Sequence, residues 1–98
     1  MTRQKKSAIL AADLGNTTLT LGLYQNGRIR GKAAFPHTRI RDHLLCEALE
    51  GLIGSVAIEG IAFASVAPAH DRRFEKVLRA AVNAPFLFFA GAPQSYAI

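Results

Sequence analysis

The stretch Ile9–Tyr24, ILAADLGNTTLTLGLY, constrains the fold more than any other part of this chain. A short apolar run ends at Asp13, and from Thr18 onward leucines alternate with small or polar residues. An apolar run bounded by a turn signal and a run of period two are both typical of β-strands. The polar residues between the two runs therefore predict a turn that joins neighbouring strands of one sheet.

The rest of the chain predicts a third strand and then alternating helices and strands. Asn26-Gly27 is a strong hairpin signal, because both central residues of a type I′ turn need positive φ. Beyond Pro36 the apolar spacing becomes helical. The predicted strands are Ser7–Asp13, Thr18–Tyr24, Arg28–Phe35, Ile58–Val66 and Ala84–Gly91, and the predicted helices begin at Ile40 and Pro68. The third strand is polar, so we expect it near an edge of the sheet.

Each predicted helix has one apolar stripe that should face the sheet. The stripes are Ile40, Leu44, Leu45, Leu49, Leu52 and Ile53 in the first helix, and Phe74, Val77, Leu78, Ala81 and Val82 in the second. The order β-β-β-α-β-α-β requires antiparallel hairpins first and then parallel pairing through right-handed crossovers. The sequence therefore predicts an α/β fold, a mixed sheet with helices on its faces. This arrangement resembles a ribonuclease H-like or actin-like ATPase half-domain.

Composition favours one folded domain in a reducing compartment. The chain has 98 residues, half of them hydrophobic, and no apolar run approaches the roughly 20 residues of a membrane span. Asp13 follows too soon for the apolar core of a signal peptide. The single cysteine fits a cytoplasmic location. We expect residues 1–6 to be a flexible basic tail and residues 7–98 to be the domain. The net charge of +5 is scattered along the chain, which does not favour nucleic-acid binding.

The predicted turn carries groups that suit a phosphate and its metal ion. Asp13 offers a carboxylate, Gly15 permits a tight or left-handed backbone, and Asn16, Thr17 and Thr18 add short hydrogen-bonding side chains. A phosphate needs N–H and O–H donors, while Mg²⁺ needs carboxylate oxygen, often through water. An ordinary Asx-type turn, in which the same side chains satisfy only the backbone, fits the spacing equally well.

Two segments resemble a known family. AADLGNTTLTLGLY is similar to the phosphate-binding hairpin of the type III pantothenate kinases, in the actin-like kinase superfamily, and IEGIAFASVAP (Ile58–Pro68) is similar to a strand of that family ending in a Ser-Val-x-Pro turn. The resemblance implies phosphoryl transfer from ATP to the primary hydroxyl of pantothenate, the first step toward coenzyme A. It also implies Mg²⁺ held by Asp13 directly or through water, a monovalent cation (K⁺ or NH₄⁺) and a homodimer. The residues carried over to the ATP site are Asp13, Gly15, Asn16, Thr17, Thr18 and Ser65.

The chain matches only the N-terminal portion of that family. The family's catalytic base lies in a Gly-x-Asp-Arg motif, which this sequence lacks; its only Asp-Arg, Asp71-Arg72, has a different context. The second phosphate motif, Asp-x-Gly-Thr, is also missing. We therefore expect no catalytic residue in this chain, a base and a second domain beyond Ile98, and no appreciable kinase activity of the isolated 98 residues.

Two other functions stay open. A ribonuclease H-like nuclease needs three or more converging carboxylates, and Asp13 with Glu47 or Glu50 would supply two of them. A nuclease of this class should have a further carboxylate at the end of the fourth predicted strand. The sequence there reads Ser65-Val66-Ala67. A non-catalytic nucleotide-binding or oligomerisation domain is the second alternative.

The three histidines and the cysteine show no metal-ligand spacing. None of His37, His43 and His70 is four residues from another, and Cys46 stands alone. We expect His43 at the surface and Cys46 as a partly buried, unreactive thiol. The sequence places none of these four residues in a functional site.

Overall fold

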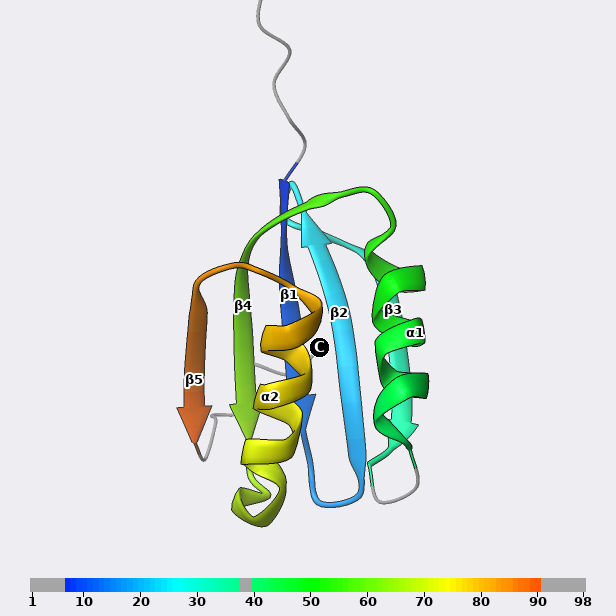
Figure 1. Ribbon diagram of the computed structural model, residues 1–98. Coiled ribbons are helices and arrows are strands. Elements are labelled where there is room, and N and C mark those ends of the chain that lie inside the picture. Colours follow the sequence, from blue (N-terminus) through cyan, green and yellow to red (C-terminus); the bar gives the residue numbers. More distant parts are fainter. Residues whose placement is uncertain (1–6, 38–39, 91–98) are drawn as a thin grey trace, which may run out of the picture.

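The computed structural model describes residues 7–37 and 40–90, which form one mixed sheet and two helices on it (Figure 1). The elements are β1 (Ser7–Leu14), β2 (Thr18–Gln25), β3 (Arg28–Pro36), α1 (Asp42–Ile53), β4 (Ala57–Ser65), a 3₁₀ turn (Pro68–His70), α2 (Asp71–Ala81) and β5 (Phe86–Ala90). The predicted element order is confirmed, and strand ends differ from the predicted ones by one or two residues. The predicted basic tail, residues 1–6, and residues 91–98 lie outside the described residues.

The five strands lie in the order β3-β2-β1-β4-β5. β2 pairs antiparallel with both β1 and β3, whereas β4 pairs parallel with β1, and β5 parallel with β4. Asn26 and Gly27 both have positive φ, 55° and 74°, which confirms the predicted hairpin turn. The polar strand β3 is an edge strand, also as predicted, and β1 lies at the centre of the sheet.

The core lies on one face of the sheet. Leu10, Ala12 and Leu14 alternate along β1 and are almost fully buried, and they join Phe63 of β4 in the same hydrophobic cluster. Both α1 and α2 cover this face (Figure 1). The expected helices on the faces of the sheet are thus found, among the described residues, on a single face. Side chains at the intervening positions of β1, such as Asp13, point to the opposite face.

Helix α1 begins later than predicted, at Asp42 rather than at Ile40. Ile40 still packs against the core, but from the connection that precedes the helix. Leu45 and Leu49 are buried as predicted, whereas Leu44 is 47% exposed. The prediction that Leu44 belongs to the apolar stripe is wrong, because Leu44 lies one position beside the line that Leu45 and Leu49 form on the helix surface.

Helix α2 follows the 3₁₀ turn that Pro68 opens, so the proline begins the turn and not the α-helix itself. Phe74, Val77 and Leu78 are buried as predicted. Ala81 is exposed instead of buried, because it is the last residue of α2 and faces a small cavity of about 160 Å³ at the end of α1. No helix in residues 7–37 and 40–90 is long and apolar enough to cross a membrane.

Candidate functional site

Asp13 lies at the carboxyl end of β1, on the face of the sheet opposite the helices. Its register partners are Thr20 on β2 and Ala64 on β4. The Asp13 side chain is half-buried and makes no hydrogen bond or ion pair with another described residue. A half-buried carboxylate without a partner is a suitable ligand for a cation.

The carboxyl ends of β1 and β4 meet at one end of the sheet, and the amino ends of α1 and α2 lie at that same end (Figure 1). In open α/β sheets, ligands bind outside the carboxyl ends of the parallel strands. The amino end of a helix carries a partial positive charge, which favours an anion nearby. The turn that follows Asp13 is therefore at the end of the molecule best suited to bind an anion.

The Gly15–Thr18 turn joins β1 to β2, includes Thr18 as the first residue of β2, and is closed by its own backbone. The Gly15 N–H donates to the Thr18 carbonyl at 2.8 Å. Gly15 does not have positive φ, and a Cβ there would meet only the Thr18 carbonyl oxygen, at an ordinary 3.5 Å. Of the two conformations that the sequence permits at Gly15, tight or left-handed, the structure has the tight one. The hydroxyls of Thr17 and Thr18 lie 3.4 Å apart at the surface.

Two carbonyl groups of this turn point inward to His37. The Asn16 carbonyl oxygen lies 2.7 Å from His37 Nε2, and the Thr17 carbonyl accepts the His37 backbone N–H at 3.0 Å. In a trans peptide the C=O and the N–H point in opposite directions, so the Thr17 N–H points away from His37. Within the described part of the chain, the backbone N–H groups of Asn16 and Thr17 have no hydrogen-bond partner. These N–H groups are available to an anion.

Ser65 does not join Asp13. Its register partner is Leu14, so its side chain lies on the helix face while Asp13 points to the other face. Ser65 is 2% exposed; its hydroxyl donates to the Asp71 carboxylate and accepts the Ala67 N–H at 3.0 Å. These bonds stabilise the turn that leads from β4 into α2, and they leave the hydroxyl engaged within that turn.

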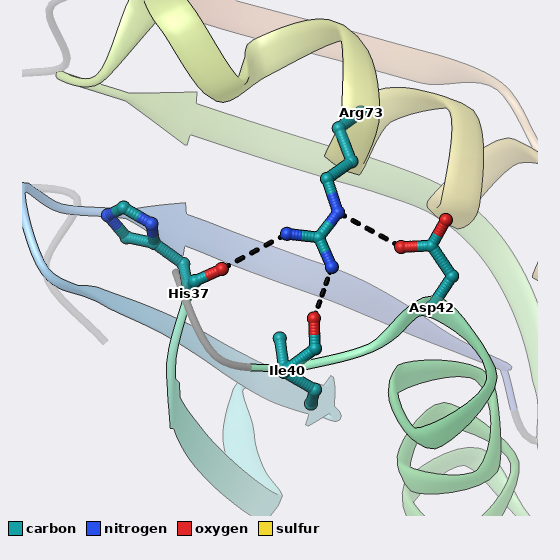
Figure 2. A network of polar contacts seen from close by, with 4 residues as sticks. All are labelled: His37, Ile40, Asp42 and Arg73. Atoms are coloured by element: carbon teal, nitrogen blue, oxygen red, sulfur yellow. Dashed lines mark hydrogen bonds and ion pairs between the residues drawn. The ribbon is translucent and has the colours of Figure 1, made fainter.

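Arg73 of α2 connects this end of the sheet to the segment that follows β3 (Figure 2). Its guanidinium donates to the His37 carbonyl at 3.1 Å, to the Ile40 carbonyl, and to the Asp42 carboxylate at 2.9 Å. One side chain thus holds the start of α1 and the end of β3 against α2.

His37 and Arg73 lie at this end of the sheet, and the sequence did not assign them to the site. His37 is 21 positions from Asn16, and Arg73 is 36 positions from His37. No spacing rule connects residues so far apart, and a lone histidine after a proline is no motif. Only the packing of β3 beside β2 brings His37 to the Gly15–Thr18 turn.

The basic face of α2 is separate from this turn. Arg72, Glu75, Lys76 and Arg79 line a surface hollow of about 640 Å³. Arg79 donates to Glu75 at 2.8 Å, and its guanidinium lies 4.3 Å from the centre of the Phe86 ring. No three His, Cys, Asp or Glu residues in the described part of the chain lie close enough together to hold a metal ion. Asp13 would thus have to bind a cation together with water or substrate oxygens.

Solved structures show which class of fold this is. The chain matches the ROK hexokinase from Thermus thermophilus with a TM-score of 0.63 and 22% identity, over 87% of this chain and 34% of that one. It also matches the PPX-GPPA enzyme of Aquifex aeolicus, with a TM-score of 0.48 and 14% identity, over 87% of this chain and 36% of that one. The match to the hexokinase shows that the fold is that of the actin-like ATPases. The chain spans about a third of the length of each of these two proteins.

The sequence comparison names the family. The profile of the type III pantothenate kinases matches residues 9–97, almost the whole chain. This protein therefore belongs to the type III pantothenate kinase family, and the resemblance predicted from the hairpin and the Ser65–Pro68 turn is confirmed. None of the curated proteins matches the chain.

Proposed function

We propose that these 98 residues are the ATP-phosphate-binding part of a kinase that phosphorylates the primary hydroxyl of pantothenate. The family supports a phosphotransferase that uses ATP. In this proposal Asp13 holds Mg²⁺ directly or through water. The N–H groups of Asn16 and Thr17 and the hydroxyls of Thr17 and Thr18 bind phosphate oxygens, and Mg²⁺ supplies the positive charge that phosphoryl transfer needs.

One observation carries the proposal. The half-buried carboxylate of Asp13 has no partner among the described residues and lies two positions before Gly15, where the turn begins. The Asn16 and Thr17 N–H groups of that turn also have no partner among these residues. Donors for phosphate and a ligand for its cation thus lie together at the end of the sheet where anions are favoured. We assign Ser65 no direct contact with ATP, since its hydroxyl is bonded to Asp71 and Ala67. Its role in this proposal is to shape the turn from β4 into α2.

The test is an Asp13→Asn variant, which keeps the shape of the side chain and removes its charge. We expect its affinity for Mg-ATP to fall about tenfold or more, because a lost contact between ligand and charged group costs about 1.5–3 kcal/mol. Isothermal titration with Mg-ATP measures the change. Glu47→Gln is the matched control, because Glu47 is exposed on α1, and it should leave the affinity unchanged. Equal affinity of Asp13→Asn and the unaltered chain would refute the assignment.

We further propose that the isolated 98 residues bind Mg-ATP without transferring phosphate. The sequence lacks the Gly-x-Asp-Arg motif that holds the family's base, and about two thirds of the hexokinase chain has no counterpart here. The base and the pantothenate site would lie in a second domain beyond Ile98. The monovalent cation and the homodimer are predictions that depend on the family resemblance alone, whereas the cytoplasmic location is a prediction that depends on the single cysteine as well.

The non-catalytic nucleotide-binding domain is the second candidate, and the same titration with a kinase assay separates the two. If binding of Mg-ATP persists when this chain is joined to a pantothenate-binding second domain and still no phosphate is transferred, the non-catalytic function is favoured. The nuclease alternative has less support, because Asp13 faces away from α1, which carries Glu47 and Glu50.

A further inference from the structure

His37 is a buried polar residue at the base of the Gly15–Thr18 turn. It is 1% exposed, and its ring lies against the ring of His70 at 4.7 Å and edge-on to Phe74 at 6.2 Å. We propose that His37 is a positioning residue for this turn: its imidazole holds the Asn16 carbonyl inward and so directs the Thr17 N–H outward to bind phosphate. The phosphate part of this inference rests on the proposed function.

The chemistry of the contact defines the state of the ring. A carbonyl oxygen can only accept, so Nε2, at 2.7 Å from the Asn16 carbonyl, must be the donor. In the neutral ring Nδ1 then carries no hydrogen. Nδ1 is buried and has no hydrogen-bond partner among the described residues.

An unpaired buried nitrogen is unfavourable, and a purely apolar ring would fill the same space without it. The packing against His70 and Phe74 therefore does not explain why the residue is a histidine. The bond from Nε2 to the Asn16 carbonyl does, because among the described residues it is the only polar contact of the ring.

The backbone of His37 is held on both sides. Its N–H donates to the Thr17 carbonyl at 3.0 Å, and its C=O accepts from Arg73 at 3.1 Å (Figure 2). The imidazole therefore starts from a fixed point when it reaches the Asn16 carbonyl. Arg73 thus links the backbone of His37, and with it the turn, to α2. Phe74 of that helix lies in the core.

The consequence concerns one peptide plane. While the Asn16 carbonyl is bonded to Nε2, the peptide between Asn16 and Thr17 cannot rotate, and its N–H stays directed outward. Without that bond the plane is free to turn, and ordering it becomes part of the cost of binding phosphate.

The experiment compares His37→Phe, which keeps an aromatic ring but has no donor, with His37→Gln, which keeps a donor of similar reach. Amide hydrogen exchange followed by NMR, and titration with Mg-ATP, are measured for both. In His37→Phe we expect faster exchange at the backbone N–H groups of Gly15 and of position 37, because these two are bonded within the turn. We also expect this variant to bind Mg-ATP about 3- to 10-fold more weakly, as for the loss of one hydrogen bond. His37→Gln should restore most of the slow amide exchange and most of the affinity for Mg-ATP. His70→Phe, which changes only the neighbouring ring, should behave like the unaltered chain.

Equal exchange and affinity in His37→Phe and the unaltered chain would overturn the inference, as would equal losses in the Phe and Gln variants. A measurement on the unaltered chain does not depend on how the variants fold: NMR of the His37 ring nitrogens should find the hydrogen on Nε2, and a hydrogen on Nδ1 alone contradicts the inference. If the unaltered chain does not bind Mg-ATP, the proposed function fails, while exchange and ring state still decide whether His37 orders the turn.

Discussion

At the scale of single residues, the clearest requirement is for glycine in the hairpin between β2 and β3. Gly27 has φ of 74° and a Cβ there would meet no atom within 4 Å, so only the backbone conformation limits the choice of residue. Gly51 offers the opposite case, an exposed helical glycine in α1 without positive φ and with the same open surroundings.

We predict opposite signs for the two alanine substitutions. Gly27→Ala should lower the free energy of unfolding by about 1–2 kcal/mol, because a Cβ makes the left-handed conformation costly. Gly51→Ala should raise it by up to about 1 kcal/mol, because alanine favours helices more than glycine does. Urea unfolding of both variants measures the changes. A shift of the same sign in the two would mean that the backbone conformation does not decide the outcome.

At the scale of elements, Arg73 is the contact that orders the segment between β3 and α1. Its ion pair with Asp42 is exposed, with 62% of the Asp42 side chain accessible, and such pairs contribute little. Its bonds to the carbonyls of His37 and Ile40 are less exposed, so they should contribute more.

Arg73→Met should therefore destabilise the protein by about 1–3 kcal/mol, since two partly buried carbonyls lose their charged donor. Asp42→Asn, which removes only the exposed charge, should cost less than about 0.5 kcal/mol. Chemical denaturation of the two variants gives the comparison. A larger loss in Asp42→Asn than in Arg73→Met would show that the ion pair, and not the carbonyl contacts, holds α2 to this segment.

At the scale of the whole molecule, the sheet is covered on one side by the described residues. Phe74 is fully buried between α2 and the sheet, whereas Leu87 of β5 is 63% exposed and Ile9 of β1 is 36% exposed. Leu87 pairs with Ala62 and lies on the same face as Asp13. The stability of this chain should therefore depend on one face of the sheet.

Phe74→Ala should cost about 3–5 kcal/mol, because it removes a ring from a packed core and leaves a cavity. Leu87→Ala should change the free energy of unfolding by less than about 0.5 kcal/mol, as exposed substitutions usually do. Thermal unfolding followed by circular dichroism compares the two. A large effect of Leu87→Ala in the isolated chain would contradict the one-sided core.

The order of the elements and the family could be predicted from the sequence alone, because the signals involved are local. Alternating leucines, the Asn26-Gly27 turn and the helical spacing of Leu45 and Leu49 each act within a few residues. The predictions are wrong where a single position decides the outcome: Leu44 lies beside its stripe, and Ala81 is exposed at the end of α2.

The candidate site likewise has one part that local sequence predicts and another part that it does not. Asp13 and the following turn are contiguous, so the sequence by itself determined which groups stand together there. Only the tertiary structure decided that Ser65 faces the other side of the sheet, and that His37 and Arg73 support the turn. The physical reason is that strand pairing and helix packing bring distant residues into contact, and the energies of those contacts depend on burial and direction, which no local pattern specifies.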